Sequence, residues 1–218
     1  MIAVVDYGAG NLASVVNALN RIGAHVDVTH DPAVIRAANG VIVPGVGAAA
    51  DTMKHLSGLE LTGVIKDVIA ADRPYLGICM GMQVLLTRSL EGGDHPCLDV
   101  IPGTVRKLPD GQPIPHMGWN QVSINGEHPL FEGIPDNTDF YFVHSYYVDP
   151  DDHEWAGGFT EYGKSFVSAV CRGNVMGTQF HPEKSGTWGL RLLENFVRIV
   201  ESDVANRTVV TNALNPGD

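Results

Sequence analysis

The sequence predicts an α/β fold: a doubly wound, mainly parallel sheet flanked by helices, with additional antiparallel strands in the C-terminal half. Three observations predict it. Short continuous apolar runs alternate with helical patterns through residue 90, and these runs end in turns rich in glycine. After residue 96 the strand-like segments are short, β-rich and separated by Gly, Pro, Asn and Asp. In such a sheet, ligands bind at the carboxyl ends of the strands.

The first unit of the sheet is a strand, a helix and a second strand. The apolar run 2–5 predicts a buried strand, and apolar positions from Leu12 to Ile22 recur at helical spacing until Gly23 ends the pattern. Residues 25–29 alternate as a strand does. We therefore expect a parallel β-α-β unit at the start of the chain.

The same alternation continues along the chain. Residues 40–43 form a second buried run closed by the loop 44–47, residues 51–71 are amphipathic enough for one or two helices, and residues 73–78 form the next run. A last helical pattern covers 189–200. The later strand-like segments, expected to be antiparallel, are 122–124, 139–143, 165–170 and 175–180.

Length and composition indicate one globular domain. The chain has 218 residues, 44% of them hydrophobic and 18% charged, so we expect a single domain over residues 1–201 and a frayed tail over 202–218. A net charge of −11 repels nucleic-acid phosphates and anionic membranes, so neither is an expected partner.

The run 2–5 is too short for a secretory signal or a membrane span, and three cysteines without a C-x-x-C pair fit a reducing compartment. We therefore expect a cytoplasmic protein.

The most informative segment is a G-x-C-x-G pattern, Gly77 to Gly81, between a buried run and an apolar helical pattern at 84–86. It predicts a nucleophile elbow with Cys79 as the nucleophile, because the flanking glycines let strand and helix backbones approach closely. A helix N-terminus also favours a thiolate. In isolation, the same pattern fits a buried cysteine beside two packing glycines.

A thiol nucleophile needs a base, and His181-Pro182-Glu183 offers one at the end of a predicted strand. Residues i and i+2 of an extended segment project to one side, so Glu183 can hold the His181 imidazole. We therefore predict a Cys79-His181-Glu183 triad, brought together at one edge of the sheet. Taken alone, His-Pro-Glu also fits a strand end with a solvated glutamate.

The predicted oxyanion hole consists of backbone N–H groups. One is that of Met80, directly after the nucleophile, and the others belong to Gly45, Val46 and Gly47 in the loop after the preceding parallel strand. The glycines of this loop also fit a simple tight turn.

A competing signal is the G-x-G-x-x-A pattern of residues 8–13, which with Asp27 or Asp31 resembles a dinucleotide site. Asp6 would repel a pyrophosphate there, and a dehydrogenase leaves Cys79 and His181 without a role. No paired metal-ligand spacing and no phosphate-binding loop is present, so we expect neither a metal nor a cofactor.

Taken together, the elbow, the loop 44–47 and the His-Pro-Glu segment resemble the class I, triad-type glutamine amidotransferases over residues 40–185. The segments 6–11, 115–120 and 181–186 are similar to the glutaminase subunits of imidazole glycerol phosphate synthase and extend the resemblance to about residues 1–200. The resemblance implies a flavodoxin-like fold.

The resemblance also implies a reaction and its residues. Cys79 attacks the side-chain amide of glutamine, His181 protonates the departing ammonia and then activates water, and Glu183 orients His181. The residues implied to contact the substrate are Gln83 and Glu91 for its α-amino group and the backbone of Ser145 and Tyr146 for its carboxylate.

In that family the ammonia passes to a β/α-barrel cyclase subunit, the partner in a heterodimer of histidine biosynthesis. The cyclase makes imidazole glycerol phosphate and aminoimidazole carboxamide ribonucleotide. The implied interface positions are Asn11, Trp119, Tyr141 and Lys184.

The oxyanion loop departs from the family pattern, because Ala49 and Ala50 follow it where an aromatic residue is common. This implies a more mobile loop and weaker control of basal hydrolysis. Two alternatives remain open: the glutaminase subunit of another ammonia-dependent synthase, and a catalytically silent binding subunit.

Overall fold

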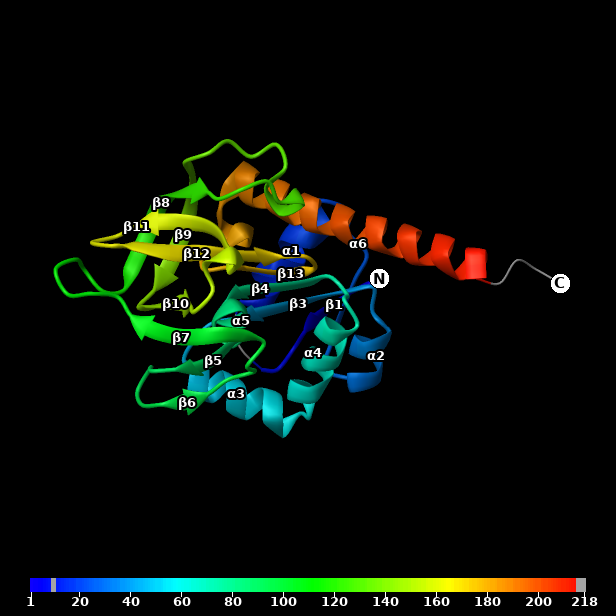
Figure 1. The fold of residues 1–218 in the computed structure, drawn as a ribbon, viewed down its shortest axis with the longest axis horizontal. Coiled ribbons are helices and arrows are strands. Elements are labelled where there is room, and N and C mark those ends of the chain that lie inside the picture. Colours follow the sequence, from blue (N-terminus) through cyan, green and yellow to red (C-terminus); the bar gives the residue numbers. More distant parts are fainter. Residues whose placement is uncertain (9–10, 215–218) are drawn as a thin grey trace.

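A computed structural model describes residues 1–8 and 11–214, and the side chains as far as Val209. Five parallel strands form its centre, in the order β2-β1-β3-β4-β13, and Figure 1 labels β1, β3, β4 and β13 side by side. Their bounds are β1 Ile2–Val5, β2 Val26–Thr29, β3 Gly40–Gly45, β4 Tyr75–Cys79 and β13 Val175–Thr178. The predicted parallel β-α-β unit at the start of the chain is confirmed.

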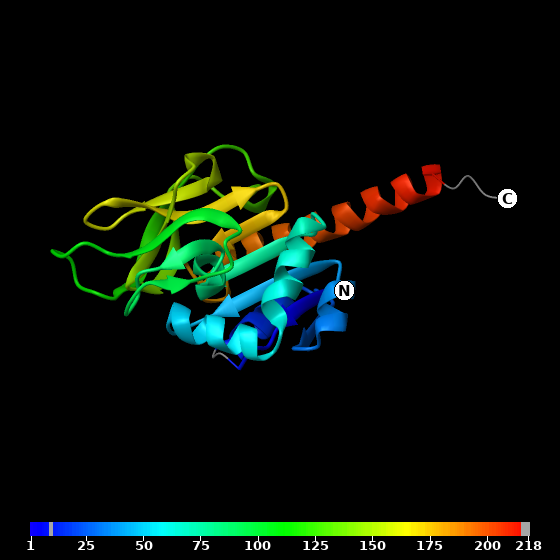
Figure 2. The ribbon, with the colours of Figure 1, turned by 60° about the horizontal axis from the view of Figure 1, so that its bottom comes forward.

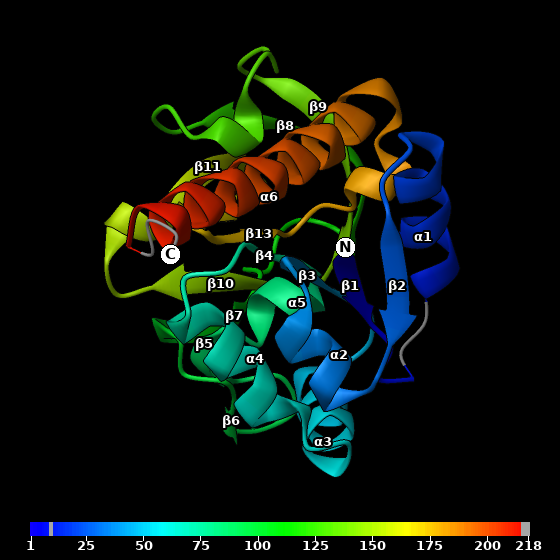
Figure 3. The same ribbon diagram turned by 90° about the vertical axis from the view of Figure 1, so that its right-hand side faces the viewer.

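Helices cover both faces of this sheet (Figure 3). On one face lie α1 (Leu12–Arg21) and α6 (Gly186–Leu214). On the other lie α2 (Pro32–Ala37), α3 (Ala49–Gly58) and α4 (Leu61–Ala70), so the amphipathic stretch 51–71 forms two helices. The six-residue helix α2, which the sequence analysis missed, is capped by the side chain of Asp31, which accepts a hydrogen bond from the N–H of Ala33 at 2.8 Å.

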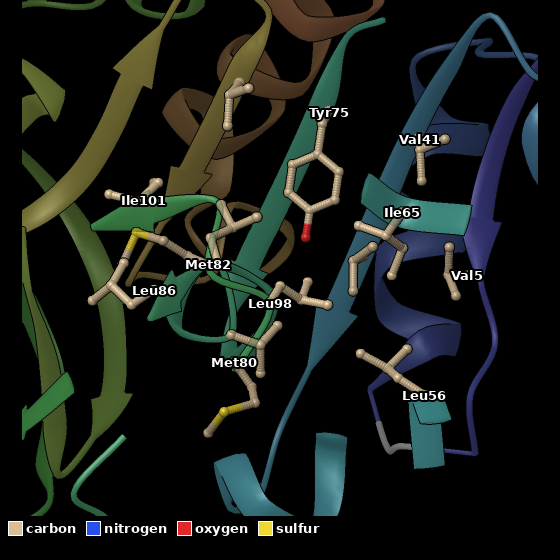
Figure 4. Packing of buried hydrophobic residues seen from close by; sticks show 14 of the residues in the cluster. Val5, Val41, Leu56, Ile65, Tyr75, Met80, Met82, Leu86, Leu98 and Ile101 are labelled. Carbon is tan, nitrogen blue, oxygen red and sulfur yellow. The ribbon is translucent and has the colours of Figure 1, made fainter. Parts of the chain in front are cut away.

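Alternation along the strands divides the core into two layers. Ala3 and Val5 pack toward α2, α3 and α4, whereas Ile2 and Val4 pack toward α1 and α6. Figure 4 shows side chains of the first layer, with Val41 and Ile65 between Tyr75 of β4 and Val5 of β1. Because each fully buried large apolar side chain contributes about 1.5–3 kcal/mol, these layers hold β4 rigidly in the middle of the sheet.

The rest of the chain adds short helical turns and further strands, which pair antiparallel as predicted, apart from the parallel pair of residues 86–89 with residues 101–107. The strands are β5 Leu86–Ser89, β6 His95–Pro96, β7 Ile101–Lys107, β8 His116–Ile124, β9 Thr138–His144, β10 Tyr146–Pro150, β11 Ala156–Glu161 and β12 Ser165–Arg172. The helical turns are α5 Met80–Gln83, η1 Pro129–Phe131, η2 His153–Trp155 and η3 Pro182–Lys184.

Two expectations need correction. The segment 175–180 was expected to be antiparallel, but β13 is antiparallel only to β12 and runs parallel to β4, with Met176 opposite Leu76. It returns to the central sheet because all of its residues are buried there. The apolar residues 84–86 do not continue a helix, since α5 ends at Gln83 and β5 begins at Leu86.

The last helix is longer than its apolar pattern. It runs to Leu214 and so covers most of the segment for which a frayed tail was expected (Figure 2). An ion pair between Asp203 and Arg207, one helical turn apart, supports this extension. Among the residues described, no helix combines the length and apolarity needed to cross a membrane.

Candidate active site

Cys79 occupies a strained turn between β4 and α5. Its backbone has φ 53° and ψ −104°, and the residue is 6% exposed. A side chain on Gly77 would overlap the backbone of Gly81, and a side chain on Gly81 would overlap the carbonyl group of Val43. Both flanking glycines are therefore required, and the predicted elbow geometry is confirmed.

A buried pair of side chains lies at the end of the neighbouring strand. Nδ1 of His181 lies 2.7 Å from Oε1 of Glu183, and the two side chains are 1% and 0% exposed. The side-chain amide of Asn11 donates to the same carboxylate oxygen. Since β13 runs parallel beside β4, its carboxyl end brings this pair to the edge of the sheet that carries Cys79. The three predicted triad residues are thus adjacent.

The electrostatics of the pair favour a charged imidazole. Burial by itself lowers the pKa of His181, but the interactions of the ring with Cys79 and Glu183 outweigh burial and raise the pKa to about 9. The second ring nitrogen, Nε2, is buried and has no hydrogen-bond partner of normal geometry among the described residues. A protonated His181 beside Cys79 favours the thiolate form of a nucleophile.

A cavity of about 270 Å³ opens beside the elbow. The predicted residues that line it are Val46, Gly47, Cys79, Met80, Gln83, Glu91, Ser145 and Tyr146. Gly45 does not line it, because this residue ends β3 and packs against Tyr7 and Met80. Three lining residues had not been predicted: Pro115, Val143 and His144.

Two polar side chains of the cavity are already oriented. Nε2 of Gln83 donates to the carbonyl oxygen of Tyr146 at 2.9 Å, which leaves its buried Oε1 without a partner among the described residues. Oε2 of Glu91 accepts a hydrogen bond from the N–H of Ala49 at 3.0 Å. The first residue of α3, next to the oxyanion loop, is thereby attached to the cavity wall.

Sequence reasoning missed two groups that support this wall. Gln179 is fully buried and its amide lies between Gln83 and Cys79. His144 donates from Nδ1 to the carbonyl oxygen of Tyr146 at 2.8 Å, and burial lowers its pKa to about 3, so the ring is neutral. The signal that could have found Gln179 is its position two residues before His181, on the same side of an extended segment.

The predicted interface residues divide into two groups. Trp119 is 57% exposed, lies opposite Tyr141 in the β8–β9 pair and contacts its ring edge-on, and Lys184 is exposed on η3. Asn11 differs, since its side chain contacts Glu183 inside the site.

The dinucleotide-like motif lies only partly within the described residues. Ala9 and Gly10 of the dinucleotide-like motif lie outside the described residues, and Asp6 accepts a hydrogen bond from the N–H of Gly8 at 3.0 Å. Among the residues that the structure describes, no group of His, Cys, Asp and Glu side chains could hold a metal ion.

Comparisons with known proteins identify the family of the chain. The family model of the class-I glutamine amidotransferases matches residues 3–200. Imidazole glycerol phosphate synthase subunit HisH of Chloroflexus aurantiacus is 55% identical over 206 residues, covering 93% of this chain and 97% of the relative. The protein of the same name from Dehalococcoides mccartyi is 52% identical over 203 residues, covering 93% of this chain and 99% of the relative.

Solved structures share the fold at low identity. A glutamine amidotransferase superposes with a TM-score of 0.71 at 18% identity, covering 92% of this chain and 100% of that one. PurLQS from Thermotoga maritima superposes with a TM-score of 0.72 at 17% identity, covering 90% and 97%. These matches support the predicted fold class.

Proposed function

The chain belongs to the class I glutamine amidotransferases, and on that premise we propose that it is the glutaminase subunit of an imidazole glycerol phosphate synthase in histidine biosynthesis. It hydrolyses L-glutamine to glutamate and ammonia. One observation carries the proposal: a strained cysteine and a buried His-Glu pair meet at the ends of two adjacent parallel strands, beside a cavity of about 270 Å³.

The first half of the reaction forms a thioester. The sulfur of Cys79 attacks the side-chain amide carbon of glutamine, and the N–H groups of Met80, Val46 and Gly47, which line the cavity, stabilise the tetrahedral oxyanion. His181 then gives its Nε2 proton to the amide nitrogen, the C–N bond breaks and ammonia leaves. Glu183 holds the ring so that Nε2, not Nδ1, faces the reacting atoms.

The second half releases glutamate. Neutral His181 takes a proton from water at Nε2 while the water oxygen bonds to the thioester carbon. The C–S bond breaks, the electron pair returns to the sulfur of Cys79 and the imidazolium is restored. The raised pKa of His181, about 9, is consistent with a ring that is protonated in the resting enzyme.

The cavity suits the amino-acid end of glutamine. We assign the substrate ammonium group to Gln83, whose buried Oε1 has no partner among the described residues, and to the carboxylate of Glu91, because both residues line the cavity and both oxygens can accept. We assign the substrate carboxylate to the backbone of Ser145 and Tyr146, on the opposite wall.

The partner we propose is the β/α-barrel cyclase, because the two relatives are named as subunits of that synthase. Its docking surface would include exposed Trp119, half-buried Tyr141 and exposed Lys184, since aromatic side chains of this kind anchor interfaces. The unpaired state of Cys79, Cys97 and Cys171 fits the cytoplasmic location proposed for the pair.

The test is glutamate release from glutamine by the purified chain, alone and with the cyclase plus its nucleotide. We expect release to rise strongly only with partner and nucleotide. Release that ignores the cyclase would keep the glutaminase and reject the pathway, which leaves another ammonia-dependent synthase. A complex that forms but releases no glutamate would indicate a silent binding subunit.

A further inference from the structure

Gln179 is a buried amide for which the reaction described above has no role. It follows β13 directly, is fully buried, and its backbone N–H donates to the carbonyl oxygen of Ser168 at 2.8 Å. Its side chain lies within hydrogen-bond distance of both Gln83 and Cys79. Burying an amide is unfavourable unless its polar atoms are paired, so each of these contacts contributes to the stability of the folded protein.

The positions of Oε1 and Nε2 in the Gln179 amide can be assigned from the backbone carbonyl group of Tyr146, which contacts Gln179 through Gln83. The carbonyl oxygen of Tyr146 can only accept, so the side-chain atom of Gln83 that lies 2.9 Å from it is the nitrogen. The same nitrogen lies 3.0 Å from the Gln179 side chain, and the atom it meets must therefore be the acceptor, Oε1. The remaining atom of Gln179, which lies 3.5 Å from the sulfur of Cys79, is the donor Nε2.

The charged and neutral groups around the sulfur determine how strong the hydrogen bond from Gln179 is. Among the described residues, the titratable groups that interact electrostatically with Cys79 are His181, charged at neutral pH, and Tyr7, whose pKa burial raises to about 12, which keeps its hydroxyl neutral. Glu91 faces the same cavity and carries the opposing negative charge. An N–H donated to a charged acceptor is stronger than a neutral hydrogen bond, so this contact stabilises the thiolate in the resting enzyme, before the sulfur bonds to the substrate carbon.

We propose that Gln179 is a further catalytic residue, whose Nε2–H donates to the sulfur of Cys79, stabilises the thiolate and holds it on the side of the cavity where Gln83 binds glutamine. This inference rests on the proposed function, because it assigns a second donor to the same nucleophile. The proposal also connects substrate binding with the orientation of Gln179. Oε1 of Gln83 accepts from the substrate, while Nε2 of Gln83 donates to Oε1 of Gln179 and so keeps the Gln179 donor directed at the sulfur.

The test is the pH dependence of Cys79 alkylation by iodoacetamide in the purified full-length chain, followed by mass spectrometry of each cysteine. Gln179→Met keeps the unbranched shape but has no donor, and Gln179→Glu puts an acceptor against the sulfur. Thr160→Val is the matched control, since it removes a buried hydroxyl that bonds Ser168 in the same sheet without touching Cys79. Cys97, whose pKa burial raises to about 11, reports the rate of an uninvolved thiol in every sample.

We expect Gln179→Met to slow alkylation of Cys79 at neutral pH about 10-fold and to move the midpoint of the profile up by about one pH unit, the loss of one hydrogen bond to a charged acceptor. Gln179→Glu slows alkylation of Cys79 further, to about 100-fold below the wild-type rate. The alkylation rate of Cys79 in Thr160→Val and the alkylation rate of Cys97 in every sample stay unchanged. With the cyclase and nucleotide, kcat for glutamate release falls in the same order as the alkylation rate.

A folded Gln179→Met or Gln179→Glu protein whose alkylation profile matches that of the wild type would overturn the inference, and Gln179 would then serve packing alone. Either variant is sufficient for the test if it folds, so the failure of one to fold leaves the other to decide whether Gln179 donates to Cys79. Failure of the proposed function looks different: wild-type Cys79 would then react no faster than Cys97.

Discussion

The stability of the protein should depend on the proton of His181. In the unfolded chain an imidazole has the ordinary pKa of 6.5; in the folded protein burial lowers this value, but Cys79 and Glu183 outweigh burial and raise it to about 9. The folded state therefore binds this proton more tightly. Its contribution to the free energy of unfolding is complete below pH 6.5 and is lost as the pH rises through about 9. The change amounts to about 3 kcal/mol, since one pKa unit corresponds to about 1.4 kcal/mol.

The assay is urea denaturation of the wild type and His181→Asn at several pH values between about 6 and about 10. The variant has no group that titrates in this position, so the wild type's free energy of unfolding, taken relative to the variant, should fall by about 3 kcal/mol across the range. His25→Asn changes an exposed imidazole and should keep the slope of the wild type.

Parallel curves for the wild type and His181→Asn would refute this reasoning. They would mean that the charged imidazole gains nothing from Cys79 and Glu183 in the folded state. The buried pair requires a fall of the same size in His25→Asn and in the wild type, larger by about 3 kcal/mol than the fall in His181→Asn.

Three further predictions concern the elbow, the nucleophile and the interface. Gly81→Ala should cost about 3 kcal/mol of stability in urea denaturation, because its Cβ would overlap the carbonyl of Val43, whereas Gly63→Ala, in α4 with open space around it, should stabilise by up to about 1 kcal/mol; equal effects would contradict the packing argument. Cys79→Ala should abolish glutamine-dependent synthesis by the complex yet spare synthesis from added ammonia, and loss of both would point to failed assembly instead. Trp119→Ala should weaken binding to the cyclase by at least about 10-fold in a titration while leaving the Tm within a few degrees, since the side chain is 57% exposed; unchanged affinity would exclude this surface from the interface.

Local patterns in the sequence predicted most of the parallel half. The apolar run at 2–5 and the helical spacing from Leu12 onward lie within one element each, so neighbouring residues carry the signal. The short helix α2 was missed because six residues complete fewer than two turns. The direction of β13 was missed because its residues suit either orientation, and only the path of the chain places it beside β4.

The candidate site shows the same division. Cys79, His181 and Glu183 could be singled out from G-x-C-x-G and His-Pro-Glu, since each pattern has a local geometric demand. Asn11 was assigned to the interface, and nothing near it in the sequence announces its bond to Glu183, 172 residues away. Gln179 carries no motif of its own.

By itself, the sequence determined which chemical groups the protein has and the local backbone that presents them: a cysteine between glycines and a histidine two residues before a glutamate. Only the tertiary structure decided the charge of His181 and the direction of the Gln83 and Gln179 amides. The physical reason is that desolvation and hydrogen bonding are sums over all surrounding groups. Here those groups come from the end of β4, from α5, from the segment that follows β13 and from the start of β10, brought together by the fold.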